Sequence, residues 1–144
     1  MAASGYNAYQ RTQIATADRR KIIVLLYEGA ISRLSQAAQA LDEGDGDRRA
    51  YNVNKALDII HFLTTSLDFE RGGAISPRLE QLYAYIRDIV TLGSIEGRRE
   101  KLEEAMRLLG TLLDAWRAIS SSGQSTSALE ESTREMAASL AVAG

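Results

Sequence analysis

The sequence of 144 residues contains no cysteine, one proline and one histidine. The absence of cysteine excludes a disulfide framework, a thiolate metal site and a thiol nucleophile. The single histidine, His61, excludes a metal site or a catalytic arrangement that needs two histidines. No apolar run reaches the roughly 18 residues that a membrane-spanning helix requires. We therefore predict a protein that is not an enzyme and needs no cofactor or metal.

Neither sign of charge is in large excess, because the sequence has 17 Lys and Arg and 19 Asp and Glu, for a net charge of -2. Binding to nucleic acid needs clustered basic residues, and the short groups at 19–21 and 98–99 are typical of solvated helix faces. The first seven residues have neither the basic nor the apolar region of a secretory signal. We expect no nucleic-acid partner, no membrane insertion and a cytoplasmic location.

The residues that are abundant favour α-helix. Ala, Leu, Glu, Arg and Gln dominate, β-branched runs are few, and 45% hydrophobic residues suffice for one core. The first long helix is expected to begin at Asp18, whose carboxylate can cap the first turn, and to end at Gly44 to Gly46. A second helix is expected over about 48–69, closed by Gly72 and Gly73.

Two more helices complete the pattern. The third is expected to begin with a hydroxyl cap at Ser76 and the helix-starting Pro77, and to stop near Gly93. The fourth, over about 98–119, has the 3-4-3-4-3 apolar spacing of a bundle seam. The residues of this seam are Leu102, Ala105, Leu109, Leu112, Trp116 and Ile119.

Short connections force consecutive helices to run antiparallel. The predicted fold is therefore all-α, an antiparallel up-down four-helix bundle formed by residues 18–120. Residues 1–17 are expected to form an N-terminal arm packed across the bundle, since tyrosine and isoleucine at 6, 9 and 14 are unusual in a solvated tail. Residues 121–144 are small and polar and are expected to form a mobile, partly helical tail.

Apolar residues on the second and third helices exceed what one narrow seam needs. Such a surplus indicates a groove for a partner helix, although each residue by itself is more typical of core. The surplus residues are Ile59, Ile60, Phe62, Leu63, Tyr83, Tyr85, Ile86, Ile89 and Val90.

Several ordered pieces of the chain form a recognisable set between residues 6 and 120. They are Ala8-Tyr9, Leu26-Tyr27-Glu28-Gly29-Ala30-Ile31, Asn54-Lys55-Ala56, Ser66-Leu67-Asp68, Gly72-Gly73-Ala74-Ile75, Leu79 to Tyr85 and Asp114-Ala115-Trp116. This set resembles the flagellar secretion chaperones of the FliS type. Arg19 stands where that family commonly has the proline that begins the first helix, a difference that should leave the fold intact.

The resemblance implies a cytoplasmic, all-helical chaperone without cofactor. Members of this family bind the disordered C-terminal region of flagellin, which folds into helices along their apolar surface. Capture prevents premature polymerisation and delivers the subunit to the flagellar type III export gate. The N-terminal segment covers part of the client surface and contributes to contact with the export gate, a role that the resemblance places on Tyr6 and Tyr9, with Ile14 as docking anchor.

The expected groove draws on the first three helices. Its residues are Leu25, Tyr27, Leu57, Ile60, Leu67, Ile75, Leu79, Leu82 and Tyr83. The pattern does not divide them between core and client surface. Two alternatives stay open: a self-associating bundle, whose apolar face forms a homodimer when no client is bound, and a phosphotransfer domain that uses His61.

Overall fold

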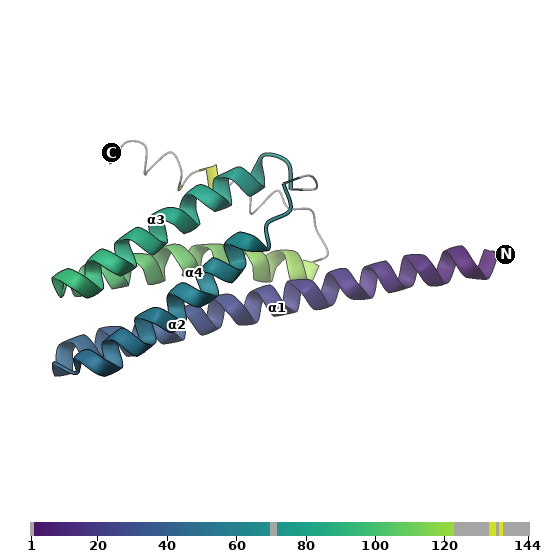
Figure 1. Ribbon diagram of the computed structural model, residues 1–144. Coiled ribbons are helices and arrows are strands. Elements are labelled where there is room, and N and C mark those ends of the chain that lie inside the picture. Colours follow the sequence, from purple (N-terminus) through teal and green to yellow (C-terminus); the bar gives the residue numbers. More distant parts are fainter. Residues whose placement is uncertain (1, 70–71, 123–132, 135, 137–144) are drawn as a thin grey trace.

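The computed structural model describes residues 2–69, 72–122, 133–134 and 136, without the side chains of 2–4, 6, 9, 12–18 and 120–122. This part of the chain forms four long α-helices and no strand (Figure 1). The helices are α1 (Ala2–Glu43), α2 (Gly46–Thr65), α3 (Ile75–Glu96) and α4 (Arg99–Ser122). The predicted all-α class is confirmed.

The helices form a ring in which each packs on two neighbours. The first, α1, lies against α2 and α4, and α3 lies against the same two helices. Consecutive helices run in opposite directions (Figure 1). This is the predicted up-down bundle, since connections of two to nine residues leave a helix no room except beside its predecessor.

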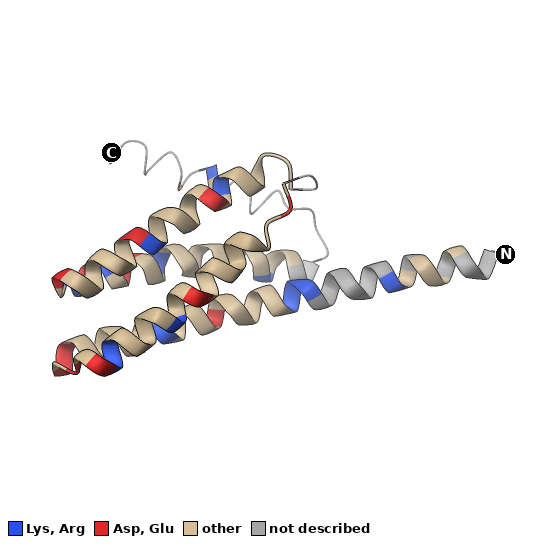
Figure 2. Ribbon diagram, viewed as in Figure 1, with Lys and Arg blue, Asp and Glu red and all other residues tan. Residues whose placement is uncertain are grey.

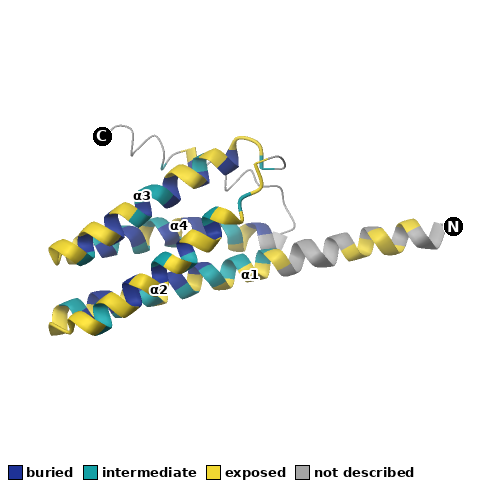
Figure 3. Cartoon of the chain, viewed as in Figure 1, coloured by how far each residue is buried: buried dark blue, intermediate teal, exposed yellow. Residues whose placement is uncertain are grey.

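The centre of the bundle is the apolar seam of α4. Every seam residue predicted from the 3-4-3-4-3 spacing is buried, except that Trp116 is partly buried. The α1 helix packs against α4, and three of its buried residues, Ala30, Ala37 and Ala38, are small and belong to the same core cluster. Buried faces point inward on all four helices (Figure 3). Removal of this apolar surface from water is the main source of stability.

Turn residues end the helices where the backbone must change direction. Gly44 has the left-handed φ of +72°, and the Asp45 carboxylate caps α2 by accepting from the Arg48 backbone N–H at 3.1 Å. The third helix ends at Glu96 with Gly97 at φ +66°, and not near Gly93 as expected. Gly93 is buried inside α3, where the start of α4 packs against it.

The connection between α2 and α3 differs from the prediction. The second helix ends at Thr65 instead of 69, and Gly73, at φ +53°, turns the chain inside the connection. Ser76 does not cap α3, which has already begun at Ile75. Its buried hydroxyl donates to the Asp68 carbonyl at 2.8 Å, so it fastens the connection to the bundle.

The predicted helix start at Asp18 is wrong, because α1 is continuous from Ala2. Its N-terminal half projects beyond the other helices instead of packing across them (Figure 1). The cause is local: Arg19 is not a proline, so nothing forces the preceding residue out of the helical region. The side chains of Tyr6, Tyr9 and Ile14 lie outside the described residues.

The tail beyond α4 was expected to be mobile. Most of residues 123–144 lie outside the described part of the chain, but two tail residues are placed. Thr133 is fully buried, and Met136 packs against the buried cluster. Thr133 and Met136 therefore add to the bundle, which the polar composition of the tail did not indicate.

Two glycines inside helices provide a matched test of the packing. A Cβ on Gly110 would meet nothing within 4 Å, whereas one on Gly93 would lie 3.0 Å from Lys101 Cβ and 3.1 Å from the Arg98 carbonyl oxygen. Gly110→Ala should raise the free energy of unfolding by about 1 kcal/mol, because alanine favours helix. Gly93→Ala should lower the free energy of unfolding, because the close contacts with α4 outweigh the same gain in helix propensity. Urea unfolding followed by circular dichroism measures both, and equal stabilisation would contradict the close packing at Gly93.

Candidate binding groove

Two adjoining hollows lie at the end of the bundle where α2 leads into α3. Their volumes are about 280 Å³ and 570 Å³. Five residues line both hollows, so the two form one depression, which we call the apolar groove. These shared residues are Arg19, Ile23, Leu63, Ser66 and Asp68.

The inner part of the apolar groove reaches the core. Leu67 and Ile75 from the α2–α3 connection and the start of α3 line it, together with Leu79 and Tyr83 one and two turns further along α3. Trp116 of α4 closes the far side. All five contact or belong to the buried cluster, so the inner part has a rigid apolar floor.

The outer part of the groove is exposed. Ile22 and Leu26 of α1 and Phe62 of α2 line it, and both Ile22 and Phe62 are 54% exposed. Leu25, which is 65% exposed, lies on the same stretch of α1. Large apolar side chains gathered at a hollow mark a site that a partner covers, because their contact with water is unfavourable.

A pair of tyrosines joins the groove floor to the core. The hydroxyls of Tyr27 on α1 and Tyr83 on α3 are hydrogen-bonded to each other, and both rings are buried. Burial raises the pKa of Tyr27 to about 12, although its bond to Tyr83 acts in the opposite direction. Burial, and then the charge and hydrogen bond of Tyr27, also raise the pKa of Tyr83. Both hydroxyls are therefore neutral at physiological pH, as a buried pair must be.

Charge is sparse around the groove. The second half of α2 is mostly uncharged, whereas charges gather at the opposite end of the bundle, where α1 turns into α2 and α3 into α4 (Figure 2). Arg19 and Asp68 are the charged groups at the groove itself. Within the described residues, no group of three or more His, Cys, Asp or Glu could hold a metal, and no helix is long and apolar enough to cross a membrane. The groove is suited to apolar binding.

The structure divides the predicted groove residues into three groups. Leu67, Ile75, Leu79 and Tyr83 line the apolar groove. A second group, Tyr27, Ile60 and Leu82, is buried in the interior, and Leu57 is partly buried against the core. Leu25 is exposed beside the groove and lines neither hollow.

Sequence reasoning did not assign four of the residues that line the groove, namely Ile22, Ile23, Leu26 and Trp116. It placed Trp116 in the α4 seam, and it named Phe62 and Leu63 only in the apolar surplus that indicated a groove. The breadth of the apolar helix stripes was the available signal, since an apolar face wider than its neighbours can cover leaves a remainder exposed. His61, the candidate for phosphotransfer, is exposed on α2 and lines neither hollow.

Comparison with known proteins identifies the family of this chain. The family described as "Flagellar protein FliS" matches residues 2–123. The chain is 32% identical over 123 residues to the flagellar secretion chaperone FliS of Salmonella typhimurium, covering 82% of this chain and 91% of that protein. It is 31% identical over 114 residues to the protein of the same name from Campylobacter jejuni, covering 79% and 89%. The chain belongs to the FliS family of flagellar secretion chaperones.

The tyrosine pair should behave as one unit. Tyr27→Phe or Tyr83→Phe alone leaves the other hydroxyl buried without its partner, which should cost about 1–3 kcal/mol of unfolding free energy. Changing both should cost less than the sum, because no orphaned hydroxyl remains. Urea unfolding of the four proteins in this cycle gives the coupling, and strictly additive losses would show that the pair contributes no mutual stabilisation.

The same pair predicts alkaline instability. The pKa values of Tyr27 and Tyr83 in the folded state lie above the usual value near 10, so the unfolded state ionises first as pH rises. The contribution of the pair to the free energy of unfolding is therefore complete below pH 10 and is lost as pH rises towards 12. Unfolding free energies between pH 8 and 12 should therefore fall less steeply for the variant with both Tyr27→Phe and Tyr83→Phe. The control is Tyr51→Phe at an exposed ring, which should keep the wild-type profile.

Proposed function

We propose that this chaperone uses the apolar groove to bind the disordered C-terminal segment of flagellin. Membership of the FliS family supports a secretion client, and the groove supports a client with apolar side chains. The single observation that carries the proposal is the set of exposed apolar residues at the outer groove, Ile22 and Phe62, with Leu25 exposed beside them, next to a buried floor. The proposed activity is binding without catalysis.

Apolar burial provides the affinity in this proposal. Full burial of a large apolar side chain contributes about 1.5–3 kcal/mol, and Phe62, which is 54% exposed, would gain about half of this when a client covers it. The client loses part of this gain because it must order its backbone as it folds into helix. The balance is a complex that is specific yet reversible, as a chaperone that later releases its client requires.

The proposed complex forms in the cytoplasm and needs no nucleotide. With its C-terminal segment folded on the chaperone, a flagellin subunit cannot use that segment to polymerise. The N-terminal half of α1 projects beyond the other helices (Figure 1). In this proposal it stays accessible while the client fills the groove. We assign contact with the export gate to this half of α1, where Tyr6, Tyr9 and Ile14 lie.

A matched pair of variants tests the proposal. Isothermal titration with a peptide of the C-terminal region of flagellin from the same organism should give one-to-one binding, a negative heat-capacity change and added helix by circular dichroism. Phe62→Ser should weaken binding at least about tenfold, because a central apolar anchor is lost, with little change in Tm. The control, Leu92→Ser, removes a similarly exposed apolar side chain of α3 that lines neither hollow, and should bind normally.

Two outcomes would contradict the proposal. Wild-type protein without detectable binding at tens of micromolar, weaker than roughly 6–7 kcal/mol, would remove flagellin as the client. Equal loss for Phe62→Ser and Leu92→Ser would remove the groove as the site.

A homodimer is the second candidate, and it is compatible with the first. The exposed groove can pair with a second copy when it is empty, because exposed apolar patches associate. Light scattering across a range of concentrations would detect such a dimer, and addition of the client peptide should dissociate it if both use the groove.

A further inference from the structure

The surface between α1 and α2 continues from the outer groove towards the α1–α2 connection. At the groove end, Ile22 and Phe62 line the same hollow. At the other end, the Arg33 guanidinium lies over the Tyr51 ring, 5.6 Å from its centroid. Eleven residues separate these two points on each helix, about 16 Å at the rise of an α-helix. The two antiparallel helices therefore border a straight strip, which we call the α1–α2 strip.

Gly29 lies midway along the α1–α2 strip. A Cβ at this position would meet only Ile59 Cδ1, at the ordinary contact distance of 3.5 Å, and Gly29 does not have a positive φ. The fold would therefore accept alanine, which is more favourable than glycine inside a helix. A glycine that the fold does not require leaves room for another backbone to approach closely. Gly29 keeps the middle of the strip open.

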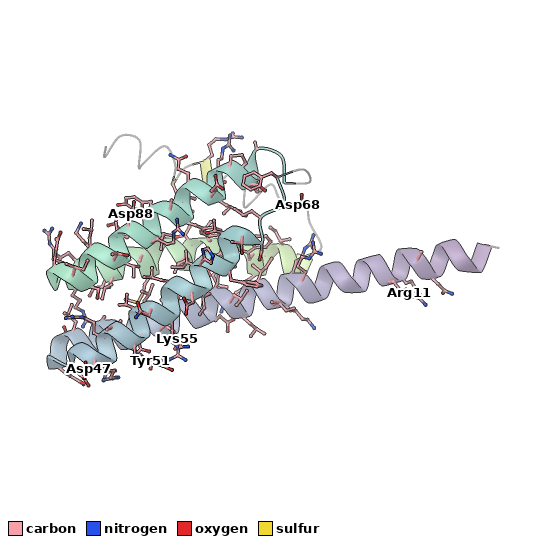
Figure 4. The ribbon with its side chains drawn as sticks, viewed as in Figure 1. Arg11, Asp47, Tyr51, Lys55, Asp68 and Asp88 are labelled. Atoms are coloured by element: carbon pink, nitrogen blue, oxygen red, sulfur yellow. The ribbon has the colours of Figure 1, made fainter. Side chains whose placement is uncertain are left out.

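The far end of the strip carries fixed positive charge. Lys55 Nζ also lies 5.6 Å from the Tyr51 ring centroid, so two cations share one exposed ring. Arg33 is held further by donating to Asn52 Oδ1 at 3.2 Å, and Asn52 donates in turn to the Arg48 carbonyl at 2.9 Å. Tyr51 and Lys55 lie side by side on the edge of α2 (Figure 4).

These cations have no carboxylate partner in the described part of the chain. Arg48, Arg99 and Arg117, by contrast, each form ion pairs. The acidic residues of α2 are Asp47 and Asp58. Asp47 lies one turn before Tyr51, and Asp58 lies three residues after Lys55. Neither forms an ion pair with Arg33 or Lys55 in the described part of the chain. A cluster of two ordered, unpaired cations is complementary to an external carboxylate.

Resting on the proposed function, we propose that the client lies along the α1–α2 strip as an amphipathic helix whose acidic side chain binds between Arg33 and Lys55. Its apolar anchor covers Ile22 and Phe62, its backbone passes over Gly29, and the carboxylate follows about eleven residues, or three turns, from the anchor. The apolar groove alone would accept any apolar helix. The cation cluster selects one with a carboxylate at this spacing and sets its direction.

Charge variants test the cluster directly. Titration uses the same flagellin C-terminal peptide at 50 mM and 500 mM salt. The variant with Arg33→Gln and Lys55→Gln should bind about three- to tenfold more weakly at low salt and lose most of the wild-type salt dependence, since exposed ion pairs are individually weak and screened. The control changes Arg87 and Arg107 to Gln, two cations of α3 and α4 without ion pairs in the described residues. It carries the same net charge and should bind as wild type.

Gly29→Ala tests the close approach independently. It should raise Tm, because alanine favours helix and fits beside Ile59, yet weaken binding about two- to tenfold by holding the client away. A loss of affinity in a stabilised protein cannot come from unfolding. Unchanged or tighter binding by Gly29→Ala would overturn the helix placement over the strip.

The remaining outcomes separate this inference from the proposed function. This inference fails alone if the wild type and the Arg33/Lys55 variant bind the peptide with equal affinity. It also fails alone if the Arg87/Arg107 control is weakened as much as the Arg33/Lys55 variant, because the cluster is then not a specific carboxylate site. If wild type does not bind the peptide at all, the proposed function fails and the inference falls with it.

Discussion

The apolar seam of α4 is the constraint on which the bundle depends. Its residues are buried along the length of α4 except for the partly buried Trp116, and both α1 and α3 pack against this helix. Because the seam is straight and long, the helices beside it can pack only as nearly parallel rods. The buried residues of α1 are mostly alanines, and those of α3 are mostly larger side chains such as Ile86 and Ile89. The arrangement of all other features follows from these two contacts.

The groove exists because the bundle closes unevenly. At one end the Ser76 hydroxyl fastens the α2–α3 connection through the Asp68 carbonyl. The outer hollow beside it is lined by residues of α1, α2 and this connection, and by none of α3 or α4. Tyr27 and Tyr83 are buried beneath the groove, where their hydroxyls are hydrogen-bonded to each other. The same residues therefore stabilise the interior and provide the floor for a partner. Stability and binding are coupled here through shared packing.

The long α1 gives this chain a feature that the family resemblance did not indicate. Where a proline would end one segment and begin another, Arg19 lets a single helix pass through. The residue also borders the groove, so the same position determines both the direction of the N-terminal half and the charge at the groove edge. A folded-back arm would cover the bundle, whereas a continuous helix leaves the groove and its own N-terminal half accessible at the same time.

The sequence by itself determined the helical class, the bundle and the α4 seam, because local propensity, glycine turns and apolar spacing all depend on neighbours along the chain. It also predicted that helices two and three carry more apolar surface than a core needs. Only the tertiary structure decided which residues are exposed. Ile60 and Phe62 are two residues apart and both apolar, yet one is fully buried and the other is half exposed. Periodicity identifies a face, but the position of neighbouring helices decides which part of that face remains uncovered.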